Sequence, residues 1–175
     1  MGASDWNYFA PYQKNISKAL QELREAVFQR GQYYQRPPYW QNMTFEEFLP
    51  PDPDLTEEDK ADYLAEFQKL QTLPEPTSIE TLIQWNAEDG THSIIDIDEI
   101  APTPSFGTAA PLSNEALERF FGTDKPTREM IESQASDLGV FLQQEMGRSR
   151  WEGTYIVVYK DSEPDEIYFT GYSGD

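Results

Sequence analysis

The stretches TYIVVYK (residues 154–160) and EIYFTGY (residues 166–172) decide the fold of this chain. Both are rich in β-branched and aromatic residues, which favour the pleated backbone of a strand. Between them lies DSEPD (residues 161–165), whose Asp, Ser and Pro residues favour a turn. The sequence therefore predicts a β-hairpin over residues 154–172.

This hairpin needs support from other elements, because two strands alone are marginally stable in water. The only other clear strand candidate is HSIIDID (residues 92–98), which we place in the same sheet. Residues 13–30 carry apolar side chains at spacings of three and four, which predicts an amphipathic helix that ends at Gly31. The predicted fold class is α+β, with an N-terminal helical layer packed on a small, mostly antiparallel sheet that contains the C-terminal hairpin.

Capping patterns predict three more helices in the first hundred residues. In each, a Thr stands three residues before an acidic residue, as in a capping box: Thr44 with Glu47, Thr56 with Asp59, and Thr77 with Glu80. The middle helix runs to about Leu73 and is predicted to bury its apolar residues and to expose its acidic ones. The residues predicted to be buried are Leu64, Phe67 and Leu70, and those predicted to face water are Asp59, Asp62 and Glu66.

Two further helices are predicted before the hairpin. Ser113 is a typical N-cap for a short helix that reaches Phe120. Pro126 suits the first turn of a helix and begins a longer one that continues toward Met146.

The size and composition predict a single folded domain over residues 1–175. Of the 175 residues, 38% are hydrophobic and 14% are aromatic, which is enough for one hydrophobic core. The chain contains no cysteine, which excludes disulfides, thiolate nucleophiles and cysteine-bound metals. No basic leader and no long apolar run occurs, so we expect a cytoplasmic protein with no membrane partner.

The charge is strongly negative and unevenly distributed along the chain. The 32 acidic and 13 basic residues leave a net charge of −19, and residues 51–100 hold fourteen of the acids but only two of the basic residues. A field of this sign repels nucleic acid and anionic membranes and attracts a basic partner. We therefore expect no direct contact with nucleic acid. The plain alternative is that the acidic surface keeps the protein soluble.

The single histidine lies in THSIIDIDEI (residues 91–100). In a strand, His92, Asp96 and Asp98 would share one face, which suggests a metal or acid–base site. One histidine and two spaced carboxylates are too few for a zinc site unless other elements add ligands, and a water-exposed strand face or a buried histidine is the simpler interpretation. We therefore predict no metal and no cofactor. The ending GYSGD (residues 171–175) lacks the G-x-S-x-G spacing of a nucleophile elbow, so no catalytic residue is assigned.

Two aromatic clusters flank the first predicted helix. They are DWNYFAPY (residues 5–12) and QYYQRPPYW (residues 32–40). Aromatic residues beside prolines either pack termini and loops onto a core or stay exposed as anchors for a partner. Both interpretations remain open from the sequence.

Together these features favour a non-enzymatic, acidic protein–protein interaction module of the inhibitor or immunity type, which docks a basic protein partner. The predicted partner-binding residues are seven acids of one segment and two aromatic residues: Asp52, Asp54, Glu57, Glu58, Asp59, Asp62, Glu66, Tyr34 and Trp40. One alternative is a small metal-assisted hydrolase that uses His92 and nearby carboxylates. Another is a structural subunit of a larger assembly.

Overall fold

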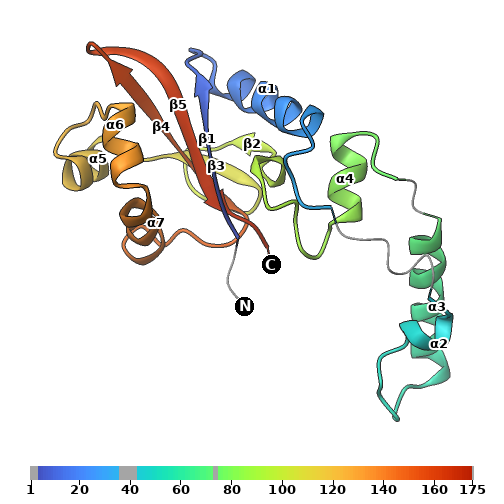
Figure 1. Ribbon diagram of the computed structural model, residues 1–175. Helices are drawn as coiled ribbons and strands as arrows, with labels where there is room; N and C mark the ends of the chain where they lie inside the picture. The colour runs from blue at the N-terminus through green and yellow to red at the C-terminus, as the bar shows by residue number, and fades with distance from the viewer. Residues whose placement is uncertain (1–3, 36–42, 73–74, 175) are drawn as a thin grey trace.

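The computed structural model describes residues 4–35, 43–72 and 75–174, and it confirms the α+β fold class (Figure 1). A five-stranded sheet forms the centre, in the strand order β1-β5-β4-β3-β2. The long strand β5 pairs antiparallel with β1 on one side and with β4 on the other. The short β3 pairs in parallel with β4, and β2 pairs in parallel with β3, so the sheet is mixed. The strands are β1 (Asp5–Pro11), β2 (Glu99–Ile100), β3 (Thr108–Pro111), β4 (Glu152–Lys160) and β5 (Glu163–Tyr172).

The predicted hairpin is confirmed as β4 and β5, but the turn is shorter than the predicted residues 161–165, because β5 already begins at Glu163. Its two loop residues, Asp161 and Ser162, both have positive φ angles, 51° and 68°, which suit the right-handed twist of a two-residue hairpin loop. Lys160 and Glu163 pair directly beside this loop. Since side chains alternate along both strands, each face of the sheet needs its own apolar cover.

The first aromatic cluster forms the edge strand β1, for which the sequence analysis predicted no strand. It pairs antiparallel with β5, so that Trp6 lies opposite Gly171 and Tyr8 lies opposite Phe169. Trp6 is buried, and the missing side chain of Gly171 makes room for it, because a Cβ there would overlap the indole ring. Core packing is therefore the correct interpretation for Trp6.

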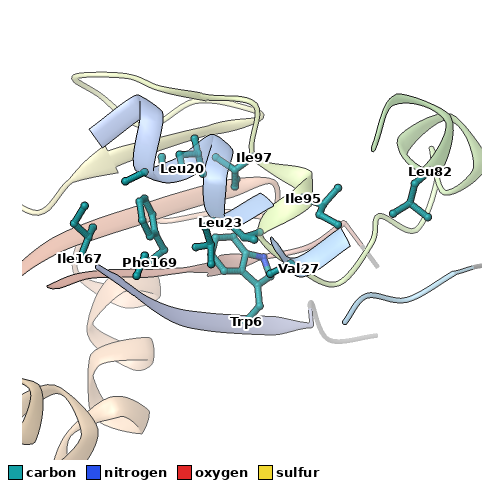
Figure 2. Packing of buried hydrophobic residues seen from close by; sticks show 13 residues of the cluster. Trp6, Leu20, Leu23, Val27, Leu82, Ile95, Ile97, Ile167 and Phe169 are labelled. Atoms are coloured by element: carbon teal, nitrogen blue, oxygen red, sulfur yellow. The ribbon is translucent and has the colours of Figure 1, made fainter. Parts of the chain in front are cut away.

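Helix α1 (Ile16–Gln29) covers one face of the sheet together with the short 3-10 helix η2 (Ile94–Asp96), and α4 (Ile79–Trp85) lies beside them and packs on η2 (Figure 1). Asn15 begins α1 as its N-cap by accepting a hydrogen bond from the Lys18 N–H at 3.1 Å. Figure 2 shows the core of this layer, where apolar side chains of α1 meet those of β1, β5 and η2. Its labelled members are Trp6, Leu20, Leu23, Val27, Leu82, Ile95, Ile97, Ile167 and Phe169.

A second helical layer covers the opposite face, so the predicted N-terminal layer is one of two. The second layer consists of α5 (Asn114–Phe121), α6 (Arg128–Ser133) and α7 (Ala135–Gln144). Ser113 caps α5 as predicted. The single long helix predicted from Pro126 is wrong, because the backbone leaves helical geometry at Gln134 (φ −121°, ψ 16°). This break lets α6 and α7 pack separately against β4 and β5, through Ile131 and Leu138 among others.

The strand predicted at residues 92–98 is also wrong, because the chain forms η2 there. Ser93 caps this turn by accepting a hydrogen bond from the Ile95 N–H at 3.2 Å. The isoleucines do not alternate between two faces, and Ile94, Ile95 and Ile97 are all fully buried. Packing in the core therefore overrides the strand preference of these β-branched residues.

Helices α2 (Phe45–Phe48) and α3 (Glu57–Gln71) lie apart from the sheet and its two helical layers (Figure 1). The predicted burial of the apolar residues of α3 is wrong. Leu64 is 38% exposed, Phe67 and Leu70 are only half-buried, and no residue of the helix is buried. The reason is that α3 packs on α2, a helix of four residues that is too small to cover it.

Two of the three predicted capping boxes are confirmed. Those of Thr44 and Thr56 are present, each with the acidic residue that the sequence predicted. The third is shifted by one residue, since Ser78 caps α4 and pairs with Thr81. Short polar side chains at neighbouring positions compete for the same role, so the residue type alone does not decide between Thr77 and Ser78.

No helix among the described residues is long and apolar enough to cross a membrane. The single domain over residues 1–175 stays a prediction. Below, the sheet and its two helical layers are called the body.

Candidate functional site

The two outlying helices form a small unit that we call the acidic hairpin (residues 44–72). Phe67 of α3 packs against Phe45 and Phe48 of α2, with ring centroids 5.9 and 5.1 Å apart. No side chain of either helix is buried. The acidic hairpin therefore has only a small apolar contact of its own.

The acidic hairpin is highly charged. It holds nine acidic residues and two lysines, a net charge of −7 within 29 residues, and all nine acidic residues are exposed. Lys60 Nζ forms an ion pair with Glu57 Oε1 at 2.7 Å. The structure thus brings the seven predicted partner-binding acids together on one exposed unit: Asp52, Asp54, Glu57, Glu58, Asp59, Asp62 and Glu66.

The acids of α3 are arranged along one side of the helix. Glu58, Asp62 and Glu66 are four residues apart and therefore lie above one another. Like charges at this spacing destabilise a helix by about 0.2–0.5 kcal/mol per pair. Tyr63 and Phe67 follow on the adjacent side and are half-buried. The row of carboxylates therefore does not stabilise the helix, but carboxylates beside aromatic side chains are suited to binding a basic surface.

The two capping boxes favour the ionised form of one acid in each helix of the acidic hairpin. The Thr56 hydroxyl donates to Asp59 Oδ2 at 2.6 Å and the Thr56 N–H donates to the same oxygen at 2.9 Å. These hydrogen bonds lower the pKa of the Asp59 carboxyl. The N–H and hydroxyl of Thr44 lower the pKa of Glu47 in the same way. Both helix starts therefore keep their negative charge to a lower pH than unperturbed carboxyls would.

The negative residues of positions 51–100 do not form one surface. Besides those on the acidic hairpin, the block includes Asp96, which is buried in the body, and Asp98, which forms an ion pair with Arg24 Nη2 at 2.8 Å. The exposed acidic surface of α2 and α3 is therefore smaller than the charge count of this block suggests.

The predicted aromatic anchor Tyr34 lies on the body. Its ring stacks on the His92 ring, with centroids 4.6 Å apart and planes tilted by 13°. Its N–H donates to the Thr91 carbonyl and its carbonyl accepts from Asn86 Nδ2, both at 2.7 Å. The predicted anchor Trp40 lies outside the described residues. Tyr34 thus joins the end of the α1 segment to the turn around His92.

The three residues considered for a metal or acid–base site have three different environments. His92 is half-buried against Tyr34, Asp96 is buried, and Asp98 is exposed beside Arg24. Within residues 4–35, 43–72 and 75–174, no group of three or more His, Asp or Glu side chains could hold a metal ion. The described residues therefore give the hydrolase alternative no metal centre.

Asp96 instead links two distant parts of the chain. It is 8% exposed, and its Oδ1 accepts a hydrogen bond from the Thr91 N–H while its Oδ2 accepts one from the Ser173 hydroxyl, both at 2.7 Å. Burial raises the pKa of the Asp96 carboxyl, and the two hydrogen bonds oppose this shift. Ser173 is fully buried, so its hydroxyl holds the C-terminal segment in place and does not face a substrate.

Arg148 and Arg150, which stand in MGRSRW (residues 146–151), have no role predicted from the sequence. In a chain with a net charge of −19, two of the 13 basic residues occur here within three positions. This local reversal of charge was the signal available in the sequence. It does not reveal that Arg148 is buried in the body, which only the structure shows.

Comparisons of the chain with models of known protein families, with curated proteins and with solved structures find no match.

Proposed function

We propose that the protein is an acidic interaction module that docks a basic protein partner through the acidic hairpin. The observation that carries this proposal is that a fifteen-residue helix buries none of its residues and exposes a row of carboxylates. Such a row attracts a surface rich in Lys and Arg and orients it during encounter. Tyr63 and Phe67 supply the adjacent apolar contact.

The partner class follows from the sign of the charge. A basic protein is attracted, whereas nucleic acid and anionic membrane are repelled, so the proposal includes neither of these as a direct ligand. An inhibitor or immunity protein that covers the basic site of a second protein is the type that suits this surface. We place this interaction in the cytoplasm, which suits a chain without cysteine.

The test neutralises the row of carboxylates in the full-length chain. The variant Glu58→Gln/Asp62→Asn/Glu66→Gln is compared with the wild type for binding to a lysine-rich amphipathic peptide, measured by stopped-flow fluorescence at several salt concentrations. Association should slow by roughly tenfold and lose most of its salt dependence, because electrostatic steering accelerates encounter. NMR spectra of the wild type should show the peptide-induced shifts within residues 44–72.

The matched control removes three charges from the body. Glu118→Gln/Glu129→Gln/Glu163→Gln changes the net charge by the same amount at exposed positions of α5, α6 and β5. It should bind the peptide at nearly the wild-type rate. Equal slowing by both triple variants would show that only the net charge matters and would contradict a docking site on the acidic hairpin.

A further inference from the structure

The loop between α7 and β4 borders an open hollow of about 560 Å³. Its lining residues are Gln143, Arg148, Ser149, Arg150 and Tyr172. The volume lies within the roughly 300–1,000 Å³ range of small-molecule sites. Two of the five lining side chains are guanidinium groups, although the chain as a whole has a net charge of −19.

Arg148 is the central group of this hollow. The residue is 8% exposed, and its Nε donates a hydrogen bond to the Thr154 hydroxyl at 2.8 Å. This bond ties the guanidinium to strand β4. The Arg148 backbone N–H donates to the Leu142 carbonyl at 2.9 Å, which anchors the loop to α7. Hydrogen bonds therefore fix Arg148 at two points, its backbone N–H and its side-chain Nε.

The two Nη groups of Arg148 have no hydrogen bond and no ion pair within the described part of the chain. Burial lowers the pKa of the Arg148 guanidinium, and the nearby negative charge of Glu152 opposes this effect. Glu152 uses its Oε2 to accept the Ser149 N–H at 2.9 Å. A buried guanidinium is costly unless it is paired and hydrogen-bonded, and here the unpaired edge borders a hollow.

We propose that this hollow, which we call the arginine hollow, binds the phosphate group of a small ligand. An arginine fork binds phosphate oxygens through two parallel N–H bonds, and Arg148 has its fork unoccupied. Arg150 is exposed at the rim, where its Nη1 donates to the Gly174 carbonyl at 3.3 Å, and its positive charge adds to the local attraction for an anion. The Ser149 hydroxyl and the Gln143 amide provide neutral donors.

The charge of the surrounding molecule restricts the ligand to small anions. A nucleic acid or an anionic membrane would have to approach the whole acidic surface, whereas a single phosphate group interacts mainly with the local guanidinium pair within the screening length of about 8–10 Å. Inorganic phosphate and the phosphate group of a small ester share this chemistry. The arginine hollow is part of the body and does not depend on the proposed role of the acidic hairpin.

The test measures binding of inorganic phosphate, phenyl phosphate and acetate to the full chain by calorimetry at constant ionic strength. Both phosphates should bind with saturation and acetate should not. Arg148→Lys keeps a positive charge but loses the fork, and it should weaken phosphate binding by at least about tenfold. Arg150→Gln should weaken it less. Tighter binding of phenyl phosphate than of inorganic phosphate would identify an ester as the ligand, and the reverse order would identify the free ion.

The control for these variants is Arg119→Gln, which removes an exposed arginine paired with Glu145 at 3.0 Å. It should bind phosphate as the wild type does. Thermal unfolding of each variant without ligand establishes that it is folded, and Arg150→Gln serves as the independent test if a change at the buried Arg148 prevents folding. Absence of saturable phosphate binding by the wild type, binding of acetate as tight as that of phosphate, or equal loss in Arg119→Gln would overturn the proposal.

Discussion

The body buries apolar residues on both faces of a five-stranded sheet, whereas α3 of the acidic hairpin buries none of its fifteen residues. Both regions have helices that begin with well-formed caps, so they do not differ in local structure. They differ in how many apolar neighbours each helix meets. The comparison teaches that a capped, regular helix is not by itself a stabilised one, because most helix stability in proteins comes from packing.

The same contrast holds for charge. In the body, Arg24 Nη2 bonds to the Ile95 carbonyl at 3.1 Å and to Asp98 at 2.8 Å, so ionic groups connect elements of the fold. In the acidic hairpin, the carboxylates of Glu58, Asp62 and Glu66 point along one helix side and repel one another. Charges serve the structure in the first region and are available to a partner in the second.

The largest difference should appear when one apolar side chain is removed from each region. Phe169→Ala removes a fully buried ring from β5 and should lower the free energy of unfolding by about 3–5 kcal/mol. Leu64→Ala removes a side chain of α3 that is 38% exposed and should cost less than about 1 kcal/mol. Urea unfolding followed by tryptophan fluorescence measures both. Similar losses for the two variants would show that α3 is packed more tightly than the structure indicates.

The next effect concerns the pH dependence that Asp96 gives to the body. Its pKa is raised in the folded state by burial, so between about pH 4 and that raised value the folded state binds more protons than the unfolded state. Stability contributed at this site therefore falls as the pH rises through this window. The variant Asp96→Asn cannot titrate at this position. Its free energy of unfolding should therefore rise relative to that of the wild type as the pH increases from about 4 toward neutrality, by about 1.4 kcal/mol for each unit by which the pKa of Asp96 is raised.

The control for Asp96 is Asp137→Asn, an exposed acid on α7. The difference in the free energy of unfolding between Asp137→Asn and the wild type should change little from about pH 4 to neutrality. His92 lies close enough to Asp96 to interact with it electrostatically, so His92→Gln is combined with Asp96→Asn to separate the two groups. A difference between Asp96→Asn and wild type that stays constant with pH would contradict the buried, proton-retaining carboxyl.

A smaller effect compares two helix caps of the same chemistry. Ser113→Ala and Thr56→Ala each remove an N-cap hydrogen bond worth about 1 kcal/mol. Because α5 packs on the body, Ser113→Ala should lower the melting temperature by about 2–4 °C. Thr56→Ala should leave this temperature unchanged and accelerate hydrogen exchange within α3. A fall in melting temperature for both would mean that α3 unfolds together with the body.

The smallest effect on stability is expected when the row of carboxylates on α3 is neutralised. Glu58→Gln/Asp62→Asn/Glu66→Gln removes repulsions worth about 0.2–0.5 kcal/mol per pair, so hydrogen exchange of α3 amides should slow slightly. Global stability should not change, because no buried contact is lost. Faster exchange in this variant would indicate that the carboxylates stabilise α3 through contacts with other residues.

Much of the local structure could be predicted from residue order. The hairpin of β4 and β5, the helix α1 and the caps at Thr44, Thr56 and Ser113 depend on residues close in sequence, and all of them are confirmed. The exposure of the acids on α3 was also predictable, because carboxylates are rarely buried without partners. The partner-binding role of these acids stays a prediction.

Errors arose where neighbours distant in sequence decided the outcome. The isoleucines around Asp96 have the composition of a strand, but their burial beneath α1 produced a 3-10 turn. The apolar residues of α3 have the spacing of a core helix, but only the four-residue helix α2 packs on them, and none becomes buried. The residues around Trp6 have no clear strand pattern, but β5 offers them an edge to pair with.

The sequence by itself determined the turn between β4 and β5, the helical periodicity, the caps, the absence of cysteine and the excess of acidic residues. These follow from the conformational preferences of single residues and from their near neighbours. Only the tertiary structure decided that Ser173 bonds to Asp96, 77 positions away, and that α3 packs only on the small helix α2. It also decided that the buried Arg148 lines a hollow, with no ion pair to a described residue. Such contacts depend on which surfaces meet after folding, and no local preference contains that information.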